Sequence, residues 1–231
     1  NGSGSKRYNM GLKLIIMGTT PFSIMLYKII EKEQFASVLA FTTGRKFMDK
    51  TKLEGLPVIA FEKLSDSFDM NQCMILNTIG YSQMNDIRKK AFFQIREEGY
   101  KLCTFISANA NVYTDKIGDG SIIMPGAFVG PYVEIGVSDI IYANVSLTHH
   151  ISIGDFVFIG SGCVVGGNVK IGDNCFVGLN STIKNKAEIP SYTLIGSGTN
   201  ILSSIPEGGG AVYVGNPARC LADKRSVDVK I

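Results

Sequence analysis

The second half of the chain repeats an aliphatic residue at every sixth position without a break. An α-helix cannot use this period, because a residue six positions on lies far round its surface. A single strand alternates every two residues instead. A fixed short period is typical of stacked, near-identical turns of chain, as in a β-helix. The fifteen members of this ladder are Ile117, Ile123, Val129, Ile135, Ile141, Leu147, Ile153, Ile159, Val165, Ile171, Val177, Ile183, Ile189, Ile195 and Ile201.

Two further positions of each hexad support stacked coils. The residue two before each ladder aliphatic is mostly small or β-branched, which suits a narrow interior. The residue directly after it is often glycine, which permits a tight corner. Three sides of six residues would close a coil of about 18 residues, stacked about 4.8 Å from the next. The glycines are Gly118, Gly130, Gly136, Gly154, Gly160, Gly166, Gly172, Gly178 and Gly196.

Residues 10–103 lack this rhythm and alternate apolar runs with amphipathic stretches. The pattern predicts buried strands at 12–17, 37–41, 56–61 and 73–79, and helices at 22–33 and 85–98. Strands that alternate with helices are typical of a small parallel α/β domain. The sequence therefore predicts two differently folded parts.

Composition narrows the classes of partner. The formal net charge of +3 leaves no basic footprint for nucleic acid. No apolar run reaches the length of a membrane span, and no signal peptide opens the chain. The five cysteines form no CxxC pair, so we expect reduced, buried thiols in a cytoplasmic protein. Residues 1–9 are expected to be a leftover of an expression vector before a native start at Met10.

The chain's only two histidines, His149 and His150, are adjacent and follow Leu147 where a corner is expected. Histidine is the usual general base near neutral pH. In a coil of about 18 residues, Gly167 would lie directly above His149 and offer an unobstructed N–H. A base beside an amide donor supplies the minimum parts for acyl transfer through an oxyanion. The alternative is that both histidines are ordinary surface residues.

Two predicted strand ends in the first half could hold a ligand, because ligands bind at the carboxyl ends of parallel strands. Gly18-Thr19-Thr20 leads from a strand into a helix, where backbone N–H groups could meet a phosphate. Only one glycine of a GxGxxG motif is present, so an ordinary turn capped by Ser23 or Thr20 fits equally well. Gly80-Tyr81-Ser82 is the second strand end, with the same alternative.

Over nearly its full length, the chain resembles the hexapeptide-repeat sugar acyltransferases of the bacterial NeuD/PglD type. The matching stretches are THHISIGDF (148–156), GGNVKIGDNCFVGLNSTI (166–183), YVGNPAR (213–219) and IGYSQMNDIRKK (79–90). The resemblance implies a Rossmann-like substrate-binding domain over 10–103 and a left-handed β-helix acyltransferase domain over 104–205. It also implies a C-terminal tail, 206–231, near the CoA site, and assembly as a homotrimer without a metal.

The implied activity is transfer of an acyl group from acetyl-CoA to a sugar in surface glycan synthesis. The implied acceptor is the amino group of a nucleotide-linked amino sugar, with a sugar hydroxyl as the alternative. His149 matches the family's base, with His150 beside it, and Gly167 matches the glycine whose N–H faces the thioester. The implied CoA-binding residues are Gly167, Gly178, Asn180, Gly196, Gly198, Pro217 and Arg219, and the implied acceptor-binding residues are Gly18, Thr19, Thr20, Thr42, Gly80 and Tyr81.

The sequence departs from the family pattern at several positions. Thr148 stands where some members carry an acidic residue that orients the imidazole, and His150 is the partner instead. Phe158 replaces a second histidine half a coil later. The acidic residue that grips the nucleotide after the second strand is absent from residues 41–44, and the first glycine turn is degraded.

Two other classes of function remain open on the residues alone. A metal lyase of the same fold, like the γ-type carbonic anhydrases, needs three histidines around zinc, whereas this chain has two side by side. A non-catalytic β-helix could act as a scaffold or surface binder. A scaffold would not need the α/β half, and the threonine ladders of an ice-binding solenoid are missing.

Overall fold

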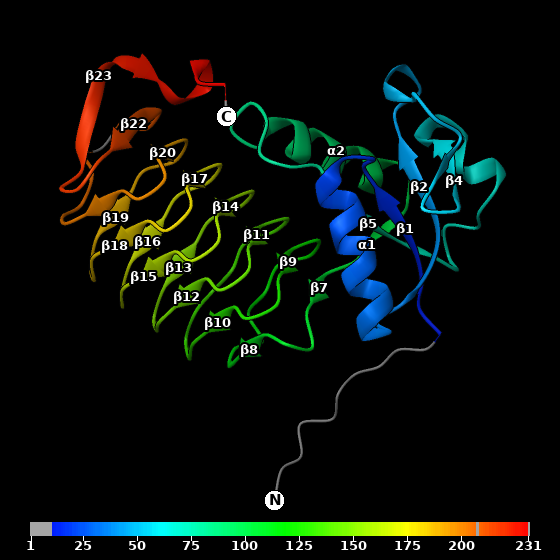
Figure 1. The fold of residues 1–231 in the computed structure, drawn as a ribbon, viewed down its shortest axis with the longest axis horizontal. Helices are drawn as coiled ribbons and strands as arrows, with labels where there is room; N and C mark the ends of the chain where they lie inside the picture. The colour runs from blue at the N-terminus through cyan, green and yellow to red at the C-terminus, as the bar shows by residue number, and fades with distance from the viewer. Residues whose placement is uncertain (1–10, 207, 231) are drawn as a thin grey trace, which may run out of the picture. The chain divides into compact units, whose positions relative to one another are not determined.

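The computed structural model describes residues 11–206 and 208–230, which divide into two compact units. The first unit runs to Ile79 and resumes over Ala91–Cys103. The second comprises Gly80–Lys90 and the chain from Thr104 onward (Figure 1). The expected leader, residues 1–9, lies outside the described residues.

The first unit is built on a mainly parallel sheet, as the alternating pattern predicts. The strand order is β3 (Lys52–Leu53), β4 (Leu56–Ala60), β2 (Ser37–Thr43), β1 (Lys13–Met17), β5 (Met74–Asn77) and β6 (Lys101–Leu102). Among the described strands of this unit, only β3 and β4 pair antiparallel. The other elements are α1 (Pro21–Glu33), η1 (Arg45–Phe47), η2 (Phe61–Asp66) and the second half of α2 (Asp86–Glu97). The strand order reverses between β1 and β5, so the ligand crevice expected of such sheets lies at their carboxyl ends.

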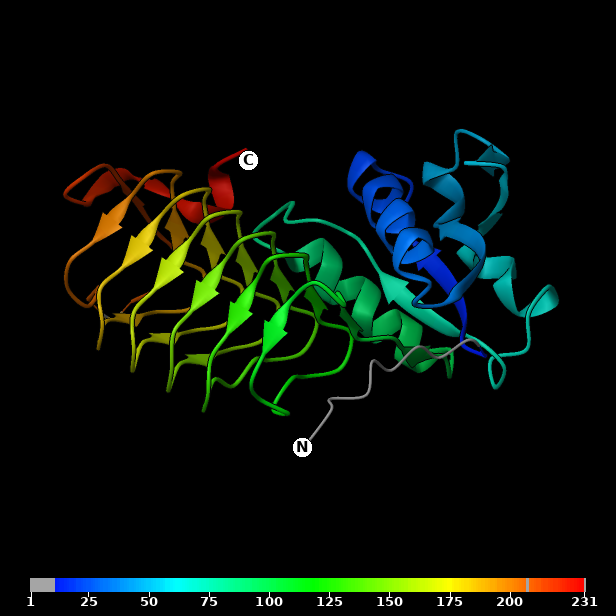
Figure 2. The same cartoon turned by 60° about the horizontal axis from the view of Figure 1, so that its bottom comes forward.

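The second unit is a parallel β-helix with three sides, whose short strands stack coil upon coil (Figures 1 and 2). The first side contains β8 (Asn111–Val112), β10 (Phe128–Val129), β12 (Ser146–Leu147), β15 (Val164–Val165), β18 (Thr182–Ile183) and β21 (Asn200–Ile201). The second side contains β13 (Ser152–Ile153), β16 (Lys170–Ile171) and β19 (Glu188–Ile189). The third side contains β7 (Phe105–Ile106), β9 (Ile122–Ile123), β11 (Ile140–Ile141), β14 (Phe158–Ile159), β17 (Phe176–Val177), β20 (Leu194–Ile195), β22 (Ala211–Val214) and the antiparallel β23 (Arg219–Arg225).

Stacked coils pair in the expected register. Leu147 pairs with Val165, and Ile141 with Ile159, so each ladder aliphatic meets the third one after it. From Ile123 onward, the ladder aliphatics are buried in one core, together with the small apolar residues that precede them by two. Because each coil buries these side chains only against its neighbours, the stack is stable as a unit.

Several of the small inward residues also donate hydrogen bonds to the next coil. Ser121, Cys163, Cys175 and Ser181 each donate to the carbonyl 15 residues on, at 2.8 to 3.1 Å. Burial raises the pKa of the Cys163 thiol to about 11 and that of Cys175 to about 12, so both keep the proton they donate. Serine and cysteine therefore suit these inward positions both because they are small and because they donate a hydrogen bond.

The ladder glycines have a different role from the one expected. None of them has a positive φ. The left-handed residue is instead the third after each ladder aliphatic from Ile117 to Ile195, for example Asn168, Asn174 and Asn180. A Cβ on Gly166 or Gly178 would lie 2.5 Å from a backbone nitrogen of the next coil. These glycines are needed for close coil spacing, and the tight corner is made two residues later.

We expect Gly172→Ala to lower the free energy of unfolding by about 1–3 kcal/mol, the usual cost of overpacking. The added Cβ would lie 2.6 Å from the Ser191 backbone nitrogen of the next coil. Gly80→Ala is the control, because a Cβ there meets nothing within 4 Å. Urea unfolding measures both variants, and equal stability of the two would contradict the coil-spacing explanation.

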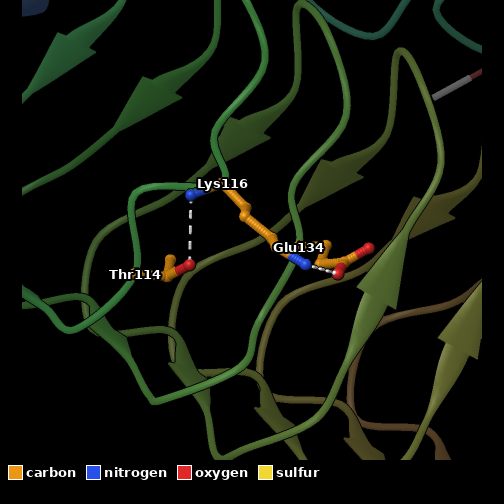
Figure 3. Close-up of polar contacts among 3 residues, drawn as sticks. All are labelled: Thr114, Lys116 and Glu134. Atoms are coloured by element: carbon orange, nitrogen blue, oxygen red, sulfur yellow. Dashed lines mark hydrogen bonds and ion pairs between the residues drawn. The ribbon is translucent and has the colours of Figure 1, made fainter.

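The second side of the helix is charged on its outer surface. Lys116 pairs with Glu134 one coil on, and the Lys116 backbone N–H donates to Thr114 at 3.1 Å (Figure 3). Lys170 and Glu188 repeat this pairing at 2.9 Å. These pairs are exposed, so each stabilises the fold by little.

Residues 80–90 belong with the β-helix, although the sequence placed them in the α/β domain. The fully buried Arg88 donates to the carbonyls of Ser138, Phe156 and Val157 at 2.8 to 3.2 Å. Its guanidinium also donates to the Gly80 carbonyl at 2.9 Å. These bonds fasten the segment to the coils, because an unpaired buried guanidinium would be very costly.

Asp139 lies buried near Arg88 and accepts from the N–H groups of Val157 and Gly136 at 2.7 and 3.1 Å. Burial raises the pKa of Asp139 and lowers the pKa of Arg88 to about 10, because each charged form loses hydration. The positive charge of Arg88 opposes the rise at Asp139, and the negative charge of Asp139 opposes the fall at Arg88. Each group therefore stabilises the charged form of the other.

We expect Arg88→Met to destabilise the protein by about 3–5 kcal/mol at pH 7, because it leaves the Asp139 carboxylate buried without its partner. The pKa of Asp139 then rises further, so its protonated form is favoured in the fold. A group whose pKa is raised on folding loses stability as the pH rises. The deficit relative to the wild type should therefore shrink as the pH falls toward about 4.

The double variant Arg88→Met/Asp139→Asn is the control, since it removes both charges. Urea unfolding at several pH values should show it to be more stable than Arg88→Met at pH 7. A deficit of Arg88→Met that stays constant with pH would contradict this account.

Candidate active site

His149 stands at the corner between β12 and β13, where backbone hydrogen bonds fix the chain on both sides. The Thr148 N–H and hydroxyl both donate to the Val165 carbonyl, at 3.2 and 3.0 Å. The His149 carbonyl accepts from the Asn168 N–H at 3.1 Å. The His150 N–H donates one coil back, to the Pro131 carbonyl, at 3.2 Å. The corner is therefore held by the coils before and after it.

The structure brings His149 and Gly167 together. A Cβ on Gly167 would lie 2.6 Å from the His149 Nε2 and 2.9 Å from its Nδ1, so the imidazole rests against the bare Cα. Within residues 11–206 and 208–230, no acceptor receives the Gly167 N–H. The corner thus pairs an imidazole with an amide donor that the coil ladder leaves unused.

His150 lies beside this pair and is itself packed on one side. The Nδ1 atoms of His149 and His150 are 3.1 Å apart, and the two rings meet edge to face at 86°. The His150 ring stacks on Tyr132, with centroids 4.5 Å apart and planes 29° apart. Tyr132 stands one full coil before His150. The 18-residue spacing of the coils could therefore have identified it as a neighbour of His150, although no sequence motif includes it.

The other residues with an implied role in CoA binding lie elsewhere on the β-helix. Gly178, Asn180, Gly196 and Gly198 occupy corners between the third and first sides, across the first side from the corner of His149. Their N–H groups all donate to the ladder, at 2.7 to 2.9 Å. Pro217 and the exposed Arg219 lie where β22 turns into β23. Within a single copy of the chain, these residues therefore do not lie next to His149.

The residues with an implied role in acceptor binding are divided between the two units. Gly18, Thr19, Thr20 and Thr42 lie in the first unit, and Gly80 and Tyr81 in the second. The Thr42 hydroxyl is buried and donates to the Ile59 carbonyl at 2.8 Å, so it is not offered to a ligand. Tyr81 packs edge-on against Phe158 and Phe176.

The Gly18 turn is closed by hydroxyl groups. Thr20 caps α1 and forms a capping box with Ser23. Thr78, which the sequence analysis did not select, donates to the Met17 carbonyl and to the Ser23 hydroxyl, both at 2.8 Å. A Cβ on Gly18 would lie 2.6 Å from both of these hydroxyl oxygens. Close packing at this turn therefore requires the single glycine.

Phe158, at the position of the missing second histidine, lies in an aromatic cluster. Its ring is parallel to that of Phe176, with centroids 5.3 Å apart, and also contacts Tyr81 and Tyr142. Across the described part of the chain, no three His, Cys, Asp or Glu side chains gather as metal ligands would. Within the same residues, no helix combines the length and apolar character needed to cross a membrane.

Comparison with known proteins supports the fold. Residues 150–185 match the family described as bacterial transferase hexapeptide (six repeats). A search of curated proteins gives no match. Among solved structures, the acetyltransferase domain of PglB from Neisseria gonorrhoeae FA1090, in complex with acetyl coenzyme A, is 23% identical with a TM-score of 0.80. That alignment covers 90% of this chain and 98% of the other.

Two further structures give the same result. PerB from Caulobacter crescentus, in complex with CoA and GDP-perosamine, is 20% identical with a TM-score of 0.80, over 90% of this chain and 96% of its own. WeeI from Acinetobacter baumannii AYE is 22% identical with a TM-score of 0.78, over 91% of this chain and 100% of its own. The expected fold, an α/β domain followed by a left-handed β-helix, is confirmed.

We expect Gly167→Ala to displace the His149 imidazole while changing the unfolding free energy by no more than about 0.5 kcal/mol. The new methyl would meet a side chain that can move, whereas Gly166→Ala would meet the Asn185 backbone. A crystal structure and a thermal melt of each variant check this. An unmoved imidazole in Gly167→Ala would contradict the contact.

Proposed function

We propose that this protein is an acetyl-CoA-dependent acyltransferase whose acceptor is the amino group of a nucleotide-linked amino sugar. The observation that carries the proposal is the His149 imidazole resting against Gly167, whose N–H has no acceptor among the described residues. The fold supports it, because the PglB domain was solved with acetyl coenzyme A and PerB with CoA and GDP-perosamine.

In this mechanism, the acceptor amine attacks the thioester carbonyl and His149 removes its proton as the new C–N bond forms. The Gly167 N–H donates to the oxyanion of the tetrahedral intermediate, a role in which one donor is worth roughly 10²–10³ in rate. The carbon–sulfur bond then breaks. The imidazolium of His149 returns the proton to the departing thiolate, which leaves as CoA. Atoms and charge balance without a metal or a redox group.

Acyl-CoA binding in this proposal uses two copies of the chain. Gly178, Asn180, Gly196 and Gly198 lie across the first side from His149, so a groove shared by two subunits would unite them. The outward residues of that side carry no charge, in contrast to the second side: Asn111, Phe128, Ser146, Val164, Thr182 and Asn200. Phe128 and Val164 are 36% and 44% exposed. An uncharged, partly apolar face suits self-association, and we propose a homotrimer.

The acceptor in this proposal binds through the α/β unit. The crevice at the carboxyl ends of β1 and β5 is the place where such sheets hold nucleotides. Gly18 and Thr78 lie at that end of β1, and the half-buried Thr19 and the exposed Thr20 would offer polar groups beside them. Residues 41–44, at the end of β2, include no acidic side chain, so recognition of the ribose would differ from that implied by the family pattern.

We expect His149→Ala to lower turnover by at least about 100-fold, the usual scale for loss of a general base. The assay detects free CoA released from acetyl-CoA across a panel of nucleotide-linked amino sugars and simple sugars. Calorimetry should show that the variant still binds acetyl-CoA, because the implied CoA-binding residues are unchanged. Lys170→Ala, on the charged second side, is the matched control and should keep wild-type turnover.

Near wild-type turnover in His149→Ala would refute the role of the base. Failure of the wild type to bind acetyl-CoA would refute the acyltransferase proposal as a whole, and would favour a non-catalytic β-helix.

A further inference from the structure

The two imidazoles at the corner are close enough to constrain each other's protons. Their Nδ1 atoms lie 3.1 Å apart, which is hydrogen-bond distance. A neutral imidazole carries a proton on one nitrogen and a lone pair on the other. Two facing lone pairs would repel, so one of the two Nδ1 atoms must donate to the other.

The direction of this bond decides whether His149 can act as a base. If His149 Nδ1 donates, its Nε2 carries the lone pair beside Gly167 and can accept a proton from an acceptor amine. If His150 donates, the proton of His149 sits on Nε2 and blocks that role. The proposed function requires that His149 Nδ1 donates. The proposal below therefore rests on the proposed function.

Backbone and ring contacts fix where the His150 acceptor points. The residue has a left-handed backbone, with φ of 52°, and its N–H is bonded to the Pro131 carbonyl. One coil earlier, Tyr132 has the same backbone form, with φ of 60°. Because the two residues are one coil apart and share a corner conformation, their rings stack face to face at 4.5 Å. Tyr132 thus supports the face of His150 and leaves its Nδ1 edge directed at His149.

We propose that His150, supported by Tyr132, is a positioning residue that accepts the Nδ1–H of His149 and holds the base in the tautomer with a free Nε2. Thr148, where some members of the resembled family carry an acidic residue, bonds instead to the Val165 carbonyl. His150 therefore supplies a neutral acceptor in place of a carboxylate. It holds the imidazole in position without adding a negative charge beside it.

Two substitutions of His150 test its role as a hydrogen-bond acceptor separately from the stacking of its ring on Tyr132. In His150→Asn, the amide oxygen occupies the branch position of Nδ1 and can still accept, and asparagine tolerates the left-handed backbone. In His150→Phe, the ring can still stack on Tyr132, but nothing accepts the proton. We expect His150→Phe to lower kcat by roughly 10–100-fold, the scale seen when an orienting partner is lost, with the KM for acetyl-CoA little changed. His150→Asn should retain a kcat much closer to that of the wild type, because the acceptor is kept.

A measurement without catalysis tests the tautomer directly. Nitrogen-15 chemical shifts of the His149 imidazole in the wild-type protein, with no substrate added, should show the proton on Nδ1. In His150→Phe the proton should move toward Nε2, and in His150→Asn it should remain on Nδ1. Tyr132→Phe keeps the stack and should behave as the wild type, whereas Tyr132→Ala should give a mixture of tautomers.

These outcomes separate failure of this proposal from failure of the proposed function. A wild-type His149 protonated on Nε2, or full kcat in His150→Phe, would overturn the positioning role even if the protein is an acyltransferase. Absence of acyl transfer with every acceptor would leave the nitrogen-15 result to decide the positioning role alone. Thermal melts check that each variant folds. Since the wild-type spectrum requires no substitution, misfolding of a variant would not prevent the test.

Discussion

The backbone pairing between coils, repeated at every third hexad, is the constraint on which the β-helix depends. It stacks each ladder aliphatic on its counterpart and fixes which residues meet at every corner. Gly167 lies over His149, and His150 over Tyr132, because the members of each pair are separated by one full coil. A one-residue insertion between Tyr132 and His149 would disrupt the contact of Tyr132 with His150, and one between His150 and Gly167 would disrupt the contact of His149 with Gly167, since the stack cannot absorb a shift in register.

The two kinds of corner differ in how the N–H of the second corner residue is used. The second residue of a corner does not donate to the backbone ladder, so its N–H needs another acceptor. Between the second and third sides, the next coil supplies one: Val137 donates to Asp155, Asp155 to Asp173, and Asp173 to Ser191, at 2.9 to 3.0 Å. At the His149 corner, no acceptor among the described residues receives the Gly167 N–H, and Gly167 has no side chain that would fill the space of the imidazole. The N–H groups at the first kind of corner are therefore bonded to side chains, whereas the Gly167 N–H remains available to a ligand.

Much of the β-helix could be predicted because its determinants recur at fixed spacing. The ladder predicted the coil length, and the coil length predicted the contact between His149 and Gly167. The role of the glycines could not be found in this way, because a left-handed backbone and a close approach of neighbouring coils both favour glycine. The position of residues 80–90 was also missed. It depends on Arg88 and the carbonyls of Ser138, Phe156 and Val157, which are far apart in sequence and have no periodic signal.

The α/β unit shows why the acceptor is harder to infer than the acyl donor. Its strands and helices follow from local apolar patterns, but its candidate site is made by residues that also stabilise the turn. Gly18, Ser23 and Thr78 meet at the end of β1, and the two hydroxyl groups satisfy each other and the Met17 carbonyl. The same three residues would be selected by a fold that needs only a closed strand-to-helix turn. At the His149 corner, by contrast, no need of the fold explains an imidazole packed against a glycine whose N–H has no acceptor among the described residues, so a catalytic role is the simpler explanation there.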